Sequence, residues 1–172
     1  SAIYLGEVFL ELAEFIAGYT KSRGKPVFYR LLTPFAKLGV ERLLGVLRSV
    51  KVVYMNEEGW GKLCETSSGL SDPANLLQLG PDIVVVTRNM QGCSVYTKQK
   101  ATEVKAPVVK AVDSTGAGDA FAAAFTKKIL EGEPAEEAAR YASTAAALST
   151  MKIGAWASMP TSEEISRLMG SR

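Results

Sequence analysis

The sequence predicts an α/β protein with an open, mostly parallel sheet and helices on both faces. Short apolar segments alternate with amphipathic segments of helical periodicity over the first half of the chain, which is the order of strand–helix–strand units. Residues 82–87 are an apolar run without polar interruption, typical of a strand that is covered on both faces of a parallel sheet. Both observations favour one sheet built largely from parallel crossovers.

The first half of the chain supplies a βαβαβ run. We expect strands at residues 2–5, 26–32 and 50–55, and helices at 7–22 and 36–49. Gly24 is expected to end the first helix. The apolar residues available for burial in that helix are Leu10, Leu12, Phe15, Ile16 and Tyr19.

The second half begins with helical segments near residues 60–66 and 73–79, followed by the apolar strand at 82–87. Shorter antiparallel strands are expected at 94–98 and 103–108. Three helices then complete the chain, at about 117–131, 135–151 and 162–169. Residues 1–172 are expected to form a single domain, since a chain of this length buries one ordinary core.

Composition excludes several classes of function. The net charge of +2 is spread along the chain, so no basic stripe predicts a nucleic-acid partner. The chain contains no histidine, which excludes a histidine-based triad, and the two cysteines, Cys64 and Cys93, lack metal-ligand spacing. No apolar stretch is long enough for a membrane span, and the start lacks a signal-peptide pattern. We therefore expect a cytoplasmic protein with no membrane partner.

The most informative segment is residues 113–121, Asp-Ser-Thr-Gly-Ala-Gly-Asp-Ala-Phe. Gly116 and Gly118 are expected at the entrance of a helix, where backbone N–H groups and the helix dipole favour an anion such as phosphate. Asp119 would bring a carboxylate to the same position, which suits a base beside a transferring phosphoryl group. The alternative is an ordinary helix cap by Thr115 or Asp113, with the glycines serving a tight turn.

This segment closely resembles the second signature of the ribokinase family, also called the PfkB carbohydrate kinases, which runs Asp-Thr-x-Gly-Ala-Gly-Asp. The resemblance implies a ribokinase-like fold. It also implies that Gly116, Ala117 and Gly118 form the anion hole for the transferred phosphate and that Asp119 is the catalytic base. The early strands, the β lid and the sugar-binding Gly-Gly segment of family members are missing here, so the chain corresponds to the C-terminal, nucleotide-binding part. It is either a fragment or a natural minimal form.

The resemblance extends to a metal site after the third strand. In the family, an Asn-x-x-Glu motif organises magnesium and the phosphates, and Asn56 matches its first residue. Position 59 is glycine, so the acid would come from Glu57 or Glu58; we take Glu58 as the candidate Mg²⁺ ligand. The alternative is that Asn56 and the glutamates cap the following helix.

Residues 87–92 resemble the family's Thr-x-Gly-x-x-Gly loop, which lies along the nucleotide. Thr87 and Gly92 match, while Asn89 replaces the first glycine and is expected to preserve the turn, since asparagine tolerates a positive φ. The adenine of ATP is expected near Ala142, Ser143 and Ala146. Small residues there could equally reflect close helix packing.

The tail at residues 149–160 also matches the family pattern. In relatives that use a monovalent cation such as K⁺, the acid that opens the signature and carbonyls of this tail bind the ion. The matching positions here are Asp113, Thr115, Ser149, Lys152, Gly154 and Ser158. A loop that merely packs under the signature is the alternative.

These observations predict an ATP-dependent kinase that transfers a phosphoryl group to the hydroxymethyl group of a sugar or sugar acid, with Mg²⁺ as cofactor. A nucleoside or vitamin alcohol is the competing substrate class. A truncated, non-catalytic nucleotide-binding module is the competing function, favoured by Gly59 and Asn89. We also expect self-association through residues 7–22 and the strand before them, because an open sheet edge and an uncovered apolar surface tend to be covered by another chain.

Overall fold

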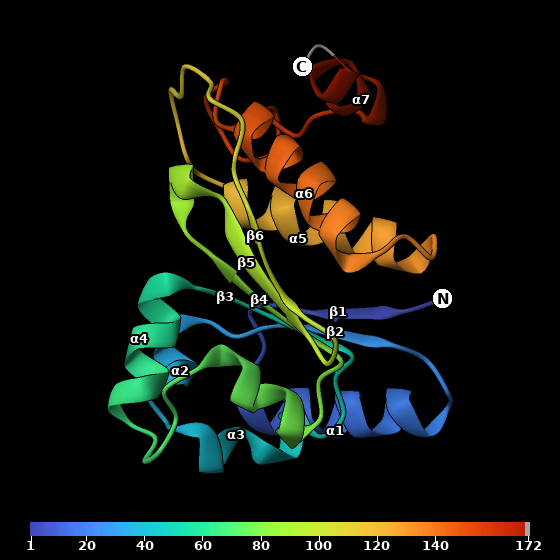
Figure 1. Cartoon of the computed structure of the whole chain (residues 1–172). Coiled ribbons are helices and arrows are strands. Elements are labelled where there is room, and N and C mark those ends of the chain that lie inside the picture. Colours follow the sequence, from blue (N-terminus) through green and yellow to red (C-terminus); the bar gives the residue numbers. More distant parts are fainter. Residues whose placement is uncertain (171–172) are drawn as a thin grey trace. The chain divides into compact units, whose positions relative to one another are not determined.

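The computed structural model describes residues 1–170, which form two compact units (Figure 1). The first unit comprises Ser1–Thr87 with Val95–Ala101, and the second comprises Arg88–Ser94 with residue 102 onward. The described strands follow the order β1-β2-β3-β4-β5-β6 in one sheet. Their bounds are β1 Ile3–Leu5, β2 Val27–Arg30, β3 Val52–Asn56, β4 Ile83–Thr87, β5 Cys93–Thr97 and β6 Ala101–Val104. The predicted α/β class and the mostly parallel open sheet are confirmed.

In the first unit, β1 to β4 are parallel neighbours, with Val53 paired to Val84 across β3 and β4. The accompanying helices lie over one face of these strands (Figure 1): α1 Leu10–Ser22, α2 Thr33–Ala36, α3 Val40–Leu47, α4 Glu57–Glu65 and the 3₁₀ helix η1 Pro73–Leu79. The core on that face joins alternate strand residues to inward helix residues. It includes Leu5, Val27, Tyr29, Val53, Met55, Val84 and Val86 with Ala13, Ala17, Leu43, Leu47 and Leu76.

Strand β4 is buried along both of its faces, as the apolar run predicts. Ile83, Val84, Val85 and Val86 are all buried, although successive side chains of a strand point to opposite faces. β4 is therefore an interior strand. Its last residue, Thr87, follows four buried residues and precedes the loop.

The expected inward face of the first helix was partly wrong. Leu12, Phe15 and Tyr19 are exposed, whereas the side chains buried by α1 are Leu10, Ala13, Ala17 and Thr20. Small inward residues allow α1 to lie close to α3, where a Cβ added at Gly45 would come within 2.7 Å of the Glu14 carboxyl group. Close packing of the two helices, rather than the burial of the largest side chains, sets the orientation of α1.

The single helix expected at residues 36–49 is instead two helices, α2 and α3, separated at Gly39. Gly39 has a φ of 81°, and a Cβ there would lie 2.8 Å from the Thr66 carbonyl oxygen. The Ser67 hydroxyl accepts a 2.8 Å hydrogen bond from the N–H of Val40, the first residue of α3. The break is thus stabilised by a segment distant in sequence.

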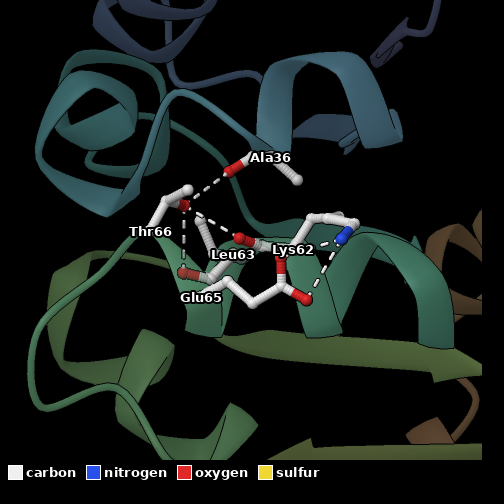
Figure 2. A network of polar contacts seen from close by, with 5 residues as sticks. All are labelled: Ala36, Lys62, Leu63, Glu65 and Thr66. Atoms are coloured by element: carbon white, nitrogen blue, oxygen red, sulfur yellow. Dashed lines mark hydrogen bonds and ion pairs between the residues drawn. The ribbon is translucent and has the colours of Figure 1, made fainter.

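Figure 2 shows how the same segment is attached to α2 and α4. The Thr66 hydroxyl lies 3.2 Å from the Ala36 carbonyl oxygen and also approaches the carbonyls of Lys62 and Leu63. Lys62 pairs with Glu65 at 2.8 Å on the outer side of α4. The end of α4 is therefore joined to the end of α2.

The second unit contains the 3₁₀ helix η2 Asn89–Gln91 and the helices α5 Ala117–Leu130, α6 Ala135–Ser149 and α7 Ser162–Gly170. Helices α5 and α6 lie side by side (Figure 1). Alanines on both helices are buried, which permits this close packing; they include Ala120, Ala122, Ala138, Ala142 and Ala145. Across residues 1–170, none of the helices has the length and apolar character needed to cross a membrane.

Candidate functional site

The Gly116 to Asp119 segment forms the entrance of α5. Gly116 is the N-cap residue, with φ 82° and ψ −3° in the left-handed region, and no side chain caps the helix. The N–H of Ala117 donates to the Ser114 carbonyl at 3.1 Å. Within residues 1–170, the N–H groups of Gly116 and Gly118 donate no hydrogen bond to a backbone carbonyl outside the helix. This entrance therefore differs from the ordinary cap by Thr115 or Asp113.

Gly116 is required by its surroundings as well as by its φ angle. A Cβ added there would lie 2.9 Å from the Cβ of Ala155 and 3.1 Å from the Cε of Met159. The signature turn consequently packs directly on the 149–160 tail. The small residue at position 116 couples these two parts of the second unit.

Asp119 lies in the first turn of α5 and is exposed. Its N–H donates to the Gly116 carbonyl oxygen at 3.0 Å. Asp119 is thus an accessible carboxylate one turn from the glycine-rich entrance.

Asp113 does not cap α5; its carboxylate instead binds the signature turn to the tail. Oδ1 accepts hydrogen bonds from the N–H and the hydroxyl of Thr115, at 2.9 and 2.7 Å, and Oδ2 accepts one from the N–H of Gly154 at 2.9 Å. These bonds, the Gly154 bond first, lower the pKa of Asp113 to about 2. The Thr150 carbonyl accepts from the N–H of Asp113 at 3.1 Å, a contact without a signal in the side-chain pattern.

The remaining candidate cation residues are less closely grouped by their side chains. The buried hydroxyls of Ser149 and Ser158 donate to nearby carbonyls, those of Ala146 at 2.8 Å and Ala155 at 3.2 Å. Lys152 is exposed and pairs with Glu164 at 3.4 Å. Asp113, Thr115 and Gly154 are therefore directly linked, while the side chains of Ser149, Lys152 and Ser158 have other partners.

Asn56 and Thr87 end the neighbouring parallel strands β3 and β4 and are paired in register. The Asn56 side chain is the N-cap of α4, with Oδ1 accepting from the N–H of Gly59 at 2.8 Å. Glu57 and Glu58 follow in the first turn of α4 and are exposed. The capping role proposed as the alternative for Asn56 is present, at the carboxyl edge where open α/β sheets bind ligands.

Gly59 fits this cap closely. A Cβ at position 59 would lie 2.9 Å from the Asn56 Oδ1 atom. A larger residue there would therefore displace the Asn56 side chain. The glycine that interrupts the expected Asn-x-x-Glu motif thus has a local packing reason.

The loop at residues 87–92 keeps the expected turn. Asn89 has a φ of 50° and is the one non-glycine residue with a positive φ among residues 1–170, which confirms that asparagine preserves the conformation. Gly92 has a φ of 98°, and a Cβ there would lie 2.0 Å from the Val104 carbonyl oxygen. The loop is closed by the N–H of Arg88, which donates to the Gly92 carbonyl at 2.7 Å.

The sequence reasoning missed a polar cluster beneath this loop. Both Glu103 carboxylate oxygens lie 2.5 Å from the Arg88 Nη2 atom, and Oε1 also accepts from the Ser94 hydroxyl at 2.8 Å. The cluster connects the start of the loop to the two strands after it. The sequence indicates that Ser94 and Glu103 lie on neighbouring strands. It does not indicate that the Glu103 carboxylate binds Arg88.

The positions expected near adenine differ in exposure. Ala142 and Ser143 are buried on α6, and the Ser143 hydroxyl lies 3.7 Å from the Cys93 sulfur atom. Ala146 is half-buried. Close packing, the alternative offered for these small residues, thus describes Ala142 and Ser143 in this structure.

The candidate residues fall into two groups. Asn56, Glu58 and Thr87 belong to the first unit, and Gly92, the 113–119 segment, the α6 positions and the tail belong to the second. Among residues 1–170, no group of three or more acidic, cysteine or histidine side chains gathers as a metal site. Mg²⁺ is commonly held by one or two protein carboxylates together with water and substrate phosphates, and the Asn56 amide and the exposed Glu58 carboxylate carry oxygen atoms of the kind that it binds.

A family model described as pfkB family carbohydrate kinase matches residues 5–162. The chain is 39% identical over 93 residues to the ribokinase of Bacillus subtilis, covering 54% of this chain and 32% of that protein. It is 37% identical over 97 residues to the 5-dehydro-2-deoxygluconokinase of a Listeria monocytogenes strain, covering 56% of this chain and 30% of that protein. The family match therefore extends over most of the chain, although the chain spans less than a third of these two relatives.

Solved structures show the same fold. Arabidopsis thaliana ribokinase complexed with ribose and ATP superposes with a TM-score of 0.84 at 26% identity, covering 98% of this chain and 55% of that chain. The Methanocaldococcus jannaschii nucleoside kinase superposes with a TM-score of 0.88 at 20% identity, covering 99% and 56%. The chain thus spans little more than half the length of these structures.

Proposed function

The chain belongs to the pfkB family of carbohydrate kinases, and on this basis we propose that it carries the phosphoryl-transfer half of an ATP-dependent sugar kinase. The observation that carries the proposal is the entrance of α5, where Gly116 adopts the left-handed conformation and Asp119 lies in the first turn. Backbone donors and one base are the groups that phosphoryl transfer requires, since the reaction depends mainly on positioning and charge stabilisation.

In the proposed reaction, the N–H groups of Gly116, Ala117 and Gly118 stabilise the transferred γ-phosphoryl group of ATP. Asp119 accepts the proton of the substrate hydroxymethyl group as its oxygen attacks phosphorus and the bond to ADP breaks. The loop from Thr87 to Gly92 lies along the nucleotide, and Ala146 borders adenine together with Ala142 and Ser143.

Asn56 and Glu58 are the residues that would hold Mg²⁺, whose charge would screen the phosphates of ATP. Asp113, with Thr115 and the tail that includes Ser149, Lys152, Gly154 and Ser158, would hold K⁺. Support for the second assignment comes from the ionised Asp113 carboxylate, which already accepts three hydrogen bonds within this loop pair.

The proposed acceptor is a sugar or sugar acid. Two relatives that share more than a third of aligned residues with this chain are named for such substrates, ribokinase and 5-dehydro-2-deoxygluconokinase. The nucleoside kinase shares the fold at 20% identity, which supports a nucleoside acceptor less strongly. A cytoplasmic location accords with this class of substrate.

The test has a binding arm and a turnover arm. ATP binding by the 172-residue chain is measured by titration calorimetry, and ADP formation is measured with a panel of sugars and sugar acids. Asp119→Asn is expected to lower turnover by about 100-fold or more, because a general base contributes at least that much, while the ATP dissociation constant stays within a few fold. Gly116→Val is expected to weaken ATP binding, since valine is strained at a φ of 82°.

A second candidate function is a nucleotide-binding module without catalysis. Gly59 favours it, because the residue that would supply the metal-site acid is replaced and Asn56 is engaged as a helix cap. This function predicts ATP binding that depends on Gly116 but no turnover with any sugar. ATP binding that survives Gly116→Val unchanged would contradict both functions.

A further inference from the structure

Residues 88–92 adopt a conformation that their own hydrogen bonds hold only weakly. Arg88 has φ −127° and ψ 45°, and Asn89 has a φ of 50°. The turn that follows is closed by the N–H groups of Gln91 and Gly92, which donate to the carbonyls of Arg88 and Asn89 at 2.9 and 3.1 Å. A residue other than glycine keeps a left-handed conformation where its surroundings fix it. The loop therefore depends on contacts with neighbouring segments.

Two consecutive residues of β6, Glu103 and Val104, contact the two ends of this loop. The Glu103 carboxylate pairs with the Arg88 Nη2 atom at 2.5 Å. At the other end, a Cβ added to Gly92 would lie 2.0 Å from the Val104 carbonyl oxygen, so the loop backbone lies directly against the backbone of β6. The loop is thus attached to one strand at both ends.

The Glu103 carboxylate is itself held in place. Its Oε1 atom accepts a 2.8 Å hydrogen bond from the hydroxyl of Ser94, which is buried on β5. The Arg88 side chain is only 27% exposed. An isolated surface ion pair contributes little, whereas a partly shielded pair that is fixed by a further hydrogen bond holds one geometry. The cluster is therefore suited to position the main chain at Arg88.

Arg88, Ser94 and Glu103 all belong to the second unit. In the function proposed above, on which this inference rests, the loop lies along ATP. We propose that Glu103 is a positioning residue for ATP, which acts through Arg88 to hold the loop in its binding conformation before the nucleotide arrives. A preformed loop lowers the dissociation constant, because the apparent affinity scales with the fraction of chains that already have the binding conformation.

A competing role for the ion pair predicts the opposite result. If Arg88 bound a phosphate of ATP directly, Glu103 would be its competitor, and removing the Glu103 charge would strengthen ATP binding. If Glu103 positions the loop, removing the charge weakens ATP binding. The geometry favours positioning, because the Arg88 side chain is engaged by Glu103 while its N–H closes the loop on the Gly92 carbonyl at 2.7 Å.

The experiment measures the ATP dissociation constant by titration calorimetry of the 172-residue chain. Glu103→Gln keeps an acceptor oxygen for Ser94 but removes the charge, and it is expected to raise the dissociation constant about fivefold, because fewer chains have the loop formed. Arg88→Gln should have a similar effect, and the double variant should bind ATP as well as either single variant, since both changes remove the same contact. Glu131→Gln is the matched control: it removes a carboxylate that pairs with Lys128 at 2.9 Å at the C-terminal end of α5, and it should leave ATP binding unchanged.

Hydrogen exchange without nucleotide tests the loop separately. The amides of Gln91 and Gly92 should exchange at least about fivefold faster in Glu103→Gln than in the wild-type chain, because the loop opens more often. The urea midpoint of Glu103→Gln should change no more than that of Glu131→Gln, which distinguishes positioning of the loop from a general loss of stability.

ATP binding that is unchanged or strengthened in Glu103→Gln would refute the role of Glu103 and leave the proposed function standing. Exchange of the Gln91 and Gly92 amides that is no faster in Glu103→Gln would refute that role as well. A wild-type chain that does not bind ATP would refute the proposed function, and this inference with it.

Discussion

At the scale of single residues, the Tyr29 hydroxyl is the least favourably placed polar atom in the core. It is buried and has no hydrogen-bond partner among residues 1–170. Burial, with a smaller contribution from the charge of Glu14, raises the pKa of Tyr29 to about 12. A buried hydroxyl without a partner is costly, whereas an apolar group of the same shape in its place is not.

Replacing Tyr29 by phenylalanine should therefore stabilise the protein. We expect Tyr29→Phe to increase the free energy of unfolding by about 1 kcal/mol, because the unpaired hydroxyl is removed and the ring is kept. Urea unfolding of the variant measures the change. Tyr19→Phe, on an exposed side chain, is the control and should have little effect; a loss of stability in Tyr29→Phe would contradict the expectation.

Residues also differ in how far the sequence reveals their role. Asn89 could be predicted to take a positive φ because that preference is intrinsic to asparagine. The reason for Gly59 could not be predicted, since it depends on the position of the Asn56 side chain in the folded cap. A residue's own conformational preference can be predicted from the sequence, whereas its contacts with side chains that are positioned only in the folded protein cannot.

At the scale of elements, the loop that opens α5 and the tail at residues 149–160 are joined by one carboxylate. Because hydrogen bonds to Gly154 and Thr115 hold the pKa of Asp113 at about 2, below its ordinary value of 3.8, ionised Asp113 stabilises the folded state. This stabilisation is fully present above about pH 4 and is lost as the pH falls through about 2.

Asp113→Asn tests this linkage. At pH 7 the variant should unfold at a lower urea concentration than the wild-type chain, and the gap should narrow as the pH is lowered from about 4 towards 2. Urea midpoints at stepped pH values give the comparison. Asp82→Asn, at an exposed carboxylate of the first unit, is the control; a gap that stays constant down to pH 2 would contradict the assigned hydrogen bonds.

The elements themselves were largely predictable, but the inward face of α1 was not. Its periodicity reveals apolar residues on two sides, and burial of the larger side chains was the natural expectation. The structure buries Ala13 and Ala17 because small residues let α1 approach α3. The break at Gly39 was hidden for a similar reason, since Ser67, which bonds to the start of α3, is distant in sequence.

At the scale of the whole molecule, the residues proposed for phosphoryl transfer are divided between the two compact units. The strand-end residues Asn56 and Thr87 belong to the first, and the Gly116 to Asp119 segment belongs to the second. The sequence could assign these residues one by one from motifs. Motif spacing could not reveal this division, because a motif records local order along the chain rather than the grouping of contacts in space.

Each unit also carries one cysteine, and the two thiols differ in accessibility. Cys93 is buried in the second unit beside Ser143, and burial raises the pKa of its thiol to about 11. Cys64 is half-buried in the first unit, and burial raises its pKa as well. Since alkylation requires an accessible thiolate, we expect iodoacetamide to modify Cys93 at least about tenfold more slowly than Cys64, as followed by peptide mass spectrometry. Equal rates would contradict the burial of Cys93.

This difference makes the chain its own reporter of local opening. Cys93 can be modified only when the second unit opens transiently, so its rate of modification follows the frequency of that opening. The rate of modification of Cys64 in the same sample serves as the reference. A molecule that rigidifies only the second unit would slow the labelling of Cys93 and leave the labelling of Cys64 unchanged. A single alkylation time course can therefore identify the half of the chain in which a ligand acts, without added probes and before any product is detected.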